Sequence, residues 1–469
     1  MLFNSREFLI LFFVTFLAYY LPMVKKYQVR ILILASLLFY AYSQPGLLLL
    51  LLSSIIWNAS ISYAIVYKSN WNRKWLATLG VSANLAIIAF FKYSGLLSTS
   101  LNLDTTSIGV FLTTLPLPLG ISFFTFEGIS LVVDTYKEKQ LSDYKSIIVR
   151  SYYENLANTT LFVSFFPHLI AGPILKAHEF YGQIGPKYFK DIPWGIAYRQ
   201  LVLGYFLKTV IADNLKDQTF WISYPYFLKY SSETLIMMLL GYSVQIFADF
   251  AGYSLIALGL ASLLGYELKG NFDHPYISTS FSEFWRRWHI SLSSFLREYL
   301  YIPLGGNRKG KVRTYLNLFL TMVLGGLWHG AAWSYAIWGM AHGVFLAAER
   351  LSNDIFPFKA TRTLKAFKLL MVFTSVTFAW LLFKLPEFGH VISYLSAIGT
   401  NLHLNSDMKR IFIIVVYSIP IFLYGLIGWR KEKGMWTRYE RTEWVFYGIM
   451  LFLLFTNMGT SADFIYFQF

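Results

Sequence analysis

The sequence contains no cysteine and is poor in charge. Only 14% of its 469 residues are charged, against roughly 25% in an ordinary globular protein. The absence of cysteine excludes disulfide bonds, thiol nucleophiles and cysteine-ligated metal sites. With 56% hydrophobic and 19% aromatic residues, the chain cannot cover its surface with polar groups in water. The composition indicates a polytopic membrane protein and argues against a soluble enzyme or a disordered scaffold.

Acidic residues are scarcer than basic ones. The chain has 40 Lys and Arg against 25 Asp and Glu, a formal net charge of +15. In a soluble chain this excess would suggest nucleic acid. Cytoplasmic loops of membrane proteins collect Lys and Arg, however, so we expect no nucleic-acid partner.

No stretch is long enough for a separate soluble domain. A helix needs about 20 apolar residues to cross the hydrocarbon core. Apolar stretches that meet or approach this length lie near residues 8–24, 31–43, 46–66, 75–91, 108–133, 151–175, 193–212, 233–265, 314–328, 331–348, 367–385, 411–428 and 443–457. Several are short or interrupted. We predict an all-α integral membrane protein, a single domain over residues 1–469, with about 12 transmembrane helices plus re-entrant or interfacial helices.

The distribution of cations predicts the orientation. Clusters of Lys and Arg follow the first, third and fifth apolar stretches, and another cluster lies at 430–441, whereas the intervening loops at 43–46 and 93–106 have none. This alternation places the N-terminus and the C-terminus outside the cytoplasm, in a protein of the inner membrane. Two outside termini require an even number of crossings.

The segment 266–313 is too polar to span a membrane and too aromatic to be a solvated loop. Its aromatic residues suit the headgroup region, so we expect amphipathic helices on the cytoplasmic face. The segment carries Arg286, Arg287, Arg308 and Lys309, which could attract a phosphate-bearing donor or serve only as topology signals.

His329 is expected to lie deep in the membrane, where an ionisable side chain is costly. A straight helix rising from Arg313 carries the chain roughly 24 Å before reaching it, most of the hydrocarbon thickness. Gly325, Gly326 and Gly330 beside it allow a close helix approach or a helix break. This pattern fits a catalytic histidine and equally a structural histidine that is hydrogen-bonded to a neighbouring helix.

The other ionisable residues carry weaker signals. His289 lies in an amphipathic stretch, where an interfacial role is the simplest interpretation. His168 and His342 lie in apolar surroundings without a distinctive partner, and Glu127, Asp134 and Asp249 are expected to form structural hydrogen bonds. No HExxH, G-x-S-x-G or P-loop motif is present, so we expect no metal site, no serine-hydrolase site and no bound cofactor.

The strings FSEFWRRWHISLSSFLREYLYIPLGGNRKG and LGGLWHGAAWSYAIWGMAHG resemble the membrane-bound O-acyltransferase family. They are most similar to the branch that acetylates bacterial polysaccharides, and the motif-bearing core is about 233–348. Further similar blocks lie at 118–136, 165–174 and 247–266. The resemblance implies a fold in which a constricted tunnel joins an outer funnel to an inner donor entrance.

The resemblance also implies roles for individual residues. His329 matches the catalytic histidine, and His289 matches the second histidine of this branch. Tyr466, in the closing FIYFQF, matches the tyrosine of a C-terminal motif and is a possible acyl carrier, with an interfacial aromatic anchor as the alternative. A neutral imidazole suits acyl transfer, because a base must remove the hydroxyl proton.

The expected function is therefore transfer of acetyl groups from cytoplasmic acetyl-CoA toward an extracytoplasmic polysaccharide, through an outward-facing partner protein. An alginate-like polymer is the first choice of acceptor, followed by peptidoglycan and then cellulose or teichoic acid. A D-alanyl donor on a carrier protein is a variant of the same activity. A transporter or flippase for a lipid-linked sugar is the rival from another class, and a structural scaffold is the third alternative.

Overall fold

The described part of the chain is helical throughout. The computed structural model describes residues 1–68, 70–137, 147–169, 172–355, 361–434 and 443–460, and these ranges contain helices and connecting segments but no strand. The all-α prediction is confirmed for them. The chain divides into two compact units, residues 1–200 with 256–269 and residues 201–255 with 270–469. The prediction of one domain over residues 1–469 stays a prediction.

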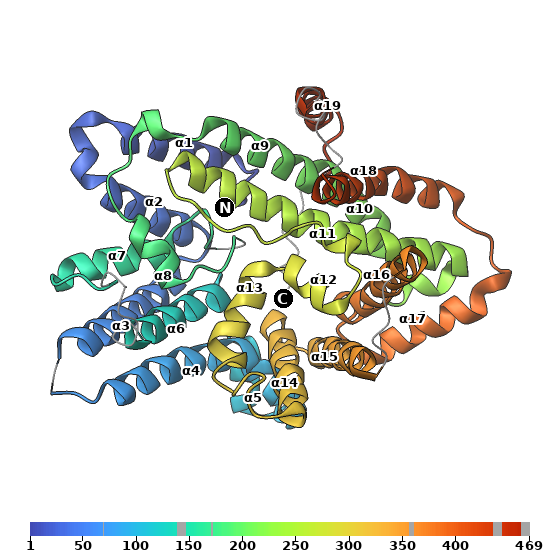
Figure 1. Cartoon of the computed structure of the whole chain (residues 1–469), viewed down its shortest axis with the longest axis horizontal. Helices are drawn as coiled ribbons and strands as arrows, with labels where there is room; N and C mark the ends of the chain where they lie inside the picture. The colour runs from blue at the N-terminus through green and yellow to red at the C-terminus, as the bar shows by residue number, and fades with distance from the viewer. Residues whose placement is uncertain (69, 138–146, 170–171, 356–360, 435–442, 461–469) are drawn as a thin grey trace. The chain divides into compact units, whose positions relative to one another are not determined.

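Three helices of the first unit begin at polar capping residues. Ser5, Asn72 and Ser151 each accept a hydrogen bond from a backbone N–H three residues later, which satisfies a donor that the helix leaves free. The helices of this unit, coloured blue to green in Figure 1, are α1 (Arg6–Tyr20), η1 (Pro22–Tyr27), α2 (Gln28–Ser43), η2 (Pro45–Leu47), α3 (Leu48–Tyr67), α4 (Arg73–Ser100), α5 (Ser107–Thr114), α6 (Ile121–Lys137), α7 (Tyr152–Ser164), α8 (Ala177–Phe180), η4 (Tyr181–Gln183), η5 (Phe189–Asp191) and most of α9 (Trp194–Tyr205).

Helices α3, α4 and α6 pack around one apolar cluster. Ile61, Leu76 and Val132 are among its buried members. A paired amide hydrogen bond lies between the same helices: Asn84 Nδ2 donates to Asn58 Oδ1 at 2.7 Å, and Asn58 Nδ2 donates to Asn84 Oδ1 at 3.2 Å. Amides that satisfy each other in this way hold helices together in apolar surroundings.

The second unit holds the histidine motifs. Its elements are the π-helix η6 (Phe206–Ala212), α10 (Asp213–Thr219), η7 (Phe220–Ile222), η8 (Tyr226–Lys229), α11 (Ser232–Leu263, whose last residues belong to the first unit), η9 (Pro275–Ile277), α12 (Phe281–Arg287), α13 (Ile290–Leu296), the π-helix η10 (Arg297–Tyr301), α14 (Lys311–His329), α15 (Trp333–Ile355), α16 (Arg362–Lys384), α17 (Phe388–Thr400), η11 (Asn401–His403), α18 (Met408–Glu432) and α19 (Glu443–Thr456).

Helices α14 and α15 make the most extensive helix–helix contact among the described elements of this unit. A Cβ atom added to Gly326 would lie 2.2 Å from the Tyr335 carbonyl oxygen, and one added to Gly339 would lie 2.3 Å from the Met322 carbonyl oxygen. The two backbones therefore meet where neither residue has a side chain, as in other small-residue helix contacts in membranes. The predicted close approach at Gly326 is confirmed.

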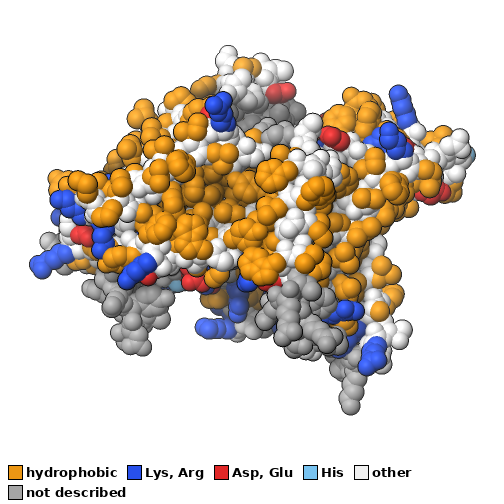
Figure 2. Space-filling model, turned by 90° about the horizontal axis from the view of Figure 1, so that it is seen from above, with side chains coloured by type: hydrophobic (Ala, Val, Ile, Leu, Met, Phe, Trp, Pro, Cys, Tyr) orange, Lys and Arg blue, Asp and Glu red, His pale blue; other side chains and the backbone are white. Residues whose placement is uncertain are grey.

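Within the described residues, five helices are long and apolar enough to cross a membrane, and a bent pair formed by α1 with η1 and α2 would make six. The five are Pro45–Tyr67, Arg73–Ser100, Ser232–Leu263, Arg362–Lys384 and Met408–Arg430. Several other predicted stretches are divided, as α5 and α6 divide residues 108–133. The count of about 12 crossings is not confirmed and stays a prediction. Figure 2 shows the setting: hydrophobic side chains cover most of the visible described surface, as a lipid-facing protein requires.

Candidate active site

His329 is the last residue of α14. The chain leaves the helix at Gly330, which is extended, and enters α15 three residues later. A side chain on Gly330 would collide with the Tyr335 ring, 2.2 Å from the Cβ position. The histidine is 3% exposed. The predicted helix break therefore exists, and it places a buried imidazole at a helix end.

Aromatic rings surround His329. Its ring centre lies 5.1 Å from that of Trp328, 5.3 Å from that of Trp338 on α15 and 5.2 Å from that of Phe383 on α16. Trp338 in turn packs 5.6 Å from Trp380. Such a shell excludes water and strengthens electrostatic interactions inside it.

His289 lies beside His329. Their ring centres are 6.0 Å apart, although the two residues belong to different motifs. His289 is completely buried, and its ring also contacts Phe250 at 4.6 Å and Trp328 at 5.8 Å. Burial lowers the pKa of His289 to about 3. The two histidines singled out from the sequence thus share one buried, aromatic environment.

The backbone at His289 is held in an unusual conformation. Its φ of 44° lies in the left-handed region, directly before α13. Asn271 supports the turn: its backbone oxygen accepts from Ile290 N at 2.9 Å, and its Oδ1 accepts from Ser291 Oγ at 2.6 Å. Asn271 Nδ2 donates to Ser254 Oγ on α11 at 3.1 Å. A strained non-glycine residue that its surroundings over-determine is typical of functional sites.

The four predicted donor-binding cations fall into two groups. Arg286, Arg308 and Lys309 are exposed. Arg287 instead contacts carboxylates, with guanidinium nitrogens 2.9 Å from Glu283 Oε1 and 2.6 Å from Glu432 Oε1. Burial raises the pKa of Glu283, but hydrogen bonds from Thr279 and the nearby Arg287 outweigh it and leave that pKa below its usual range. Arg287 is therefore engaged in fixing α12.

His342 is the site residue that the sequence signalled least. It lies one turn after Trp338 on α15, with ring centres 4.6 Å apart, and Trp285 Nε1 donates to its Nδ1 at 3.3 Å. It is completely buried. The spacing of Trp338 and His342 on one helix face is the sequence signal that could have joined it to the site.

Tyr466 lies outside the described residues. The segment that leads toward it is held by the second unit: Gly459 N donates to Thr209 O at 2.9 Å, and Asn214 Nδ2 donates to Asn457 O at 3.1 Å. Beside Thr209, Lys208 Nζ lies 2.7 Å from Asp213 Oδ1 and 2.8 Å from Asp249 Oδ1. The structural role expected for Asp249 is confirmed, with a partner that the sequence did not reveal.

Two histidines of the first unit lie against carboxyl groups. His168 Nδ1 lies 3.1 Å from Glu127 Oε1, and its Nε2 donates to the Phe162 carbonyl at 3.2 Å. His178 Nδ1 lies 2.8 Å from Asp134 Oδ2. Asp134 forms the structural hydrogen bonds expected of it, with Ser130 and His178; the hydrogen-bonding role expected of Glu127 stays a prediction. No group of three His, Asp or Glu side chains that could hold a metal ion occurs in the described ranges.

Comparison with known proteins identifies the family of this chain. Residues 35–386 match the family described as MBOAT, membrane-bound O-acyltransferase. The probable alginate O-acetylase AlgI of Pseudomonas putida is 39% identical over 394 residues, covering 82% of this chain and 77% of that protein. The peptidoglycan O-acetyltransferase of Helicobacter pylori is 36% identical over 471 residues, covering 90% and 87%. The teichoic acid D-alanyltransferase of Bacillus subtilis is 26% identical and covers 58% of this chain and 70% of that protein.

Proposed function

Because this chain belongs to the membrane-bound O-acyltransferase family, we propose that it takes acetyl groups from acetyl-CoA in the cytoplasm and delivers them toward an extracytoplasmic polysaccharide. The chain is a multi-pass membrane O-acyltransferase, which sets aside the transporter and the scaffold. The donor, the partner protein and the residue roles are our proposal.

One observation supports the chemistry most. His329 and His289, from separate motifs, lie with ring centres 6.0 Å apart inside an aromatic shell. A buried neutral imidazole can accept a proton as a hydroxyl attacks a thioester, and the low dielectric around it disfavours a resting imidazolium.

The proposed reaction balances as follows. The acceptor hydroxyl oxygen attacks the thioester carbonyl carbon, a C–O bond forms and the C–S bond breaks. His329 takes the hydroxyl proton and returns it to the departing sulfur, so that CoA leaves as a thiol. His289 positions the reacting groups beside His329.

The exposed cations Arg286, Arg308 and Lys309 supply the donor's phosphates with binding partners. Because Arg287 contacts Glu283 and Glu432, its part is to hold α12 in place. On the outer side, we propose that Tyr466 or a partner protein receives the acetyl group, with the polymer as final acceptor.

An alginate-like polymer is the first candidate acceptor, since proteins named alginate O-acetylase reach 39% identity. Peptidoglycan is the second, because the match to the peptidoglycan O-acetyltransferase extends over 90% of this chain.

The test uses full-length protein in vesicles and acetyl-CoA labelled in the acetyl group. We expect CoA release and label on the acceptor for the wild type, and neither for His329→Ala. Release of CoA by His329→Ala at the wild-type rate would contradict the proposal. Measuring acetate in exopolysaccharide and in peptidoglycan of the same deletion strain decides between the two polymers.

A further inference from the structure

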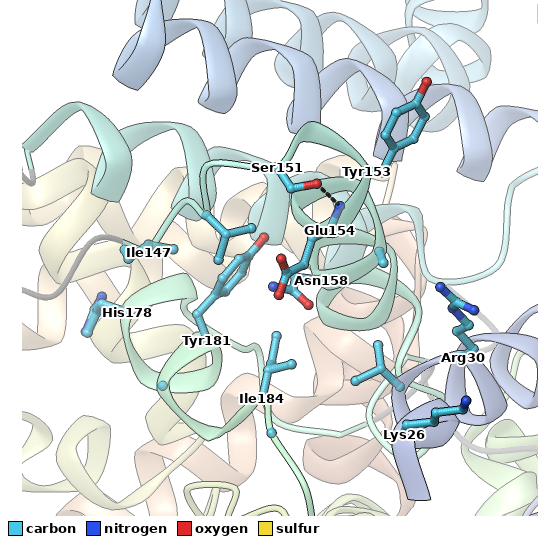
Figure 3. Close-up of a pocket in the computed structure, with 15 residues that line it drawn as sticks. Lys26, Arg30, Ile147, Ser151, Tyr153, Glu154, Asn158, His178, Tyr181 and Ile184 are labelled. Atoms are coloured by element: carbon cyan, nitrogen blue, oxygen red, sulfur yellow. Dashed lines mark hydrogen bonds between the residues drawn. The ribbon is translucent and has the colours of Figure 1, made fainter. Parts of the chain in front are cut away.

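The first unit contains a cavity of its own. It has a volume of about 860 Å³ and is lined by residues from η1, α2, α7 and η4 and from the segments beside α7 (Figure 3). Its size is in the range of sites that hold a small molecule or a lipid headgroup. None of the residues assigned to acyl transfer lines it.

Two pairs of polar side chains reach this cavity from two helical segments. Lys26 and Arg30 are four residues apart across η1 and α2, and Glu154 and Asn158 are four residues apart on α7. On the α-helix α7 this spacing places Glu154 and Asn158 on the same face. In Figure 3, Glu154 and Asn158 come from α7, whereas Lys26 and Arg30 come from the first helices of the chain. Positive charge and negative charge thus line the same cavity from separate elements.

The protein itself does not use these four side chains for ion pairing. Among the described residues, the Glu154 carboxylate and the Asn158 amide make no ion pair or side-chain hydrogen bond, and Lys26 and Arg30 contact only the ring of Tyr27, at 5.0 and 5.4 Å. Their neighbours differ: Tyr181 Oη lies 3.0 Å from Thr159 Oγ1, and His178 is paired with Asp134. The cavity therefore keeps two cations, one carboxylate and one amide available to a ligand.

The surroundings are those of a membrane interface. Lys26 and Arg30, which line the cavity, follow the apolar helix α1 in the sequence. Tyr153, another lining residue, is 84% exposed. Close to it, Lys25 Nζ lies 3.8 Å over the ring of Tyr188. Tyrosines and cations that follow an apolar helix are typical of the headgroup layer. A lipid can enter from that layer directly.

We propose that this cavity binds the headgroup of a zwitterionic aminophospholipid. Lys26 and Arg30 hold the phosphate, Glu154 holds the ammonium group, and the Asn158 amide donates to an ester carbonyl. Val29, Val149 and Ile184 line the cavity for the apolar part of the lipid. An anionic headgroup would satisfy the cations but bring negative charge beside Glu154, whereas a zwitterion satisfies both walls.

The test is native mass spectrometry of the full-length protein, mixed with equal amounts of phosphatidylethanolamine and phosphatidylglycerol that have identical acyl chains. We expect the wild type to retain phosphatidylethanolamine preferentially. Glu154→Gln should lower that retention about tenfold, the effect of one charge-assisted hydrogen bond, without lowering retention of phosphatidylglycerol. The double variant Lys26→Gln, Arg30→Gln should lose both lipids.

Lys190→Gln and Asp191→Asn are matched controls, because both residues are exposed in the same unit and do not line the cavity. Both control variants should retain the two lipids in the same proportion as the wild type. Melting temperatures measured without lipid should be equal for all variants. Equal retention of the two lipids by the wild type, or an unchanged preference in Glu154→Gln, would overturn the proposal. Displacement of the lipid by soluble glycerophosphoethanolamine or CoA at equal concentration would show a site for soluble phosphates and overturn the lipid assignment.

Discussion

The histidines that the two units enclose have different neighbours. In the first unit, His168 lies against Glu127 and His178 against Asp134. In the second unit, the rings of His289 and His329 pack against each other, and His329 and His342 both pack against Trp338. Burial disfavours the charged imidazole at His168 and at His329 alike, and the two sites differ in their neighbours, a carboxyl group in the first and aromatic rings in the second.

We expect this difference to separate structural histidines from the proposed catalytic one. A carboxylate fixes the imidazole and its protonation state, which suits a residue that holds helices together. An aromatic shell keeps the imidazole neutral and makes a proton transfer a transient event, which suits a general base. The comparison therefore predicts that changes in the second unit affect turnover and that changes in the first unit affect stability.

The largest expected effect is on turnover. His329→Ala should lower kcat by about 10²–10⁴-fold, the usual contribution of a general base, while thermal stability changes little. Steady-state release of CoA by purified protein measures this. His403→Ala, at an exposed histidine, is the control and should turn over normally. Near-normal kcat in a folded His329→Ala protein would contradict the assignment of turnover to the histidines of the second unit.

The next effect is on stability. Glu127→Ala leaves His168 without its carboxylate neighbour, and both side chains are fully buried. Losing this buried polar neighbour should cost about 1–3 kcal/mol of folding free energy. A lowered melting temperature, with unchanged kcat in the folded fraction, is the expected result. A stable Glu127→Ala protein with strongly reduced kcat would place catalytic chemistry in the first unit.

His289 allows a finer test, because its backbone and its ring can be separated. Asn tolerates a left-handed backbone better than Ala does, so His289→Asn should keep its stability and lose about tenfold to a hundredfold in kcat. His289→Ala should lose in addition about 1 kcal/mol of stability. Normal turnover in His289→Asn would show that this position serves only the fold.

The exposed cations should affect affinity. Replacing Arg308 and Lys309 by Gln should raise the KM for acetyl-CoA several-fold with little change in kcat, the pattern of lost uniform binding. The effect should shrink at high salt, which screens exposed charges. Lys311→Gln, at an exposed lysine paired with Asp354, is the control. An unchanged KM at low salt would return Arg308 and Lys309 to a topological role.

The smallest effect concerns the pH dependence of folding. The pKa of Glu283 is below its usual range, so its contribution is fully present above the ordinary carboxyl pKa and is lost as the pH falls through the lowered value. The pair with Arg287 is partly exposed, which limits the contribution to about 1 kcal/mol or less. Melting temperatures of wild type and Glu283→Gln should converge as the pH decreases, and a constant difference would contradict this assignment.

The sequence predicted the parts of the site that follow from local pattern. The WHG and RRWH motifs identified both histidines, and the glycines around His329 predicted the helix break and the close approach. The all-α class followed from composition. These predictions needed only short spacings and the cost of burying polar groups.

Long-range partners could not be predicted in this way. Nothing near Asp249 in the sequence indicates Lys208, and nothing near His168 indicates Glu127, because these pairs form only when separate segments pack. Arg287 was grouped with the other cations for the same reason, since Glu432 lies far along the chain. The number of crossings also depends on how short and divided helices are arranged, which hydropathy alone does not give.

The contact between Gly326 and Gly339 has a consequence for enzyme engineering. Because backbone meets backbone there, the spacing of α14 and α15 cannot be narrowed, and any added methyl group would force the helices apart. The space beside the His329 ring can therefore be changed only through the size of the side chains at Trp338 and Phe383, and not through the spacing of the two helices. Under the proposed role of His329, smaller side chains at Trp338 and Phe383 would make room for a bulkier acyl group, provided that Gly326 and Gly339 are kept.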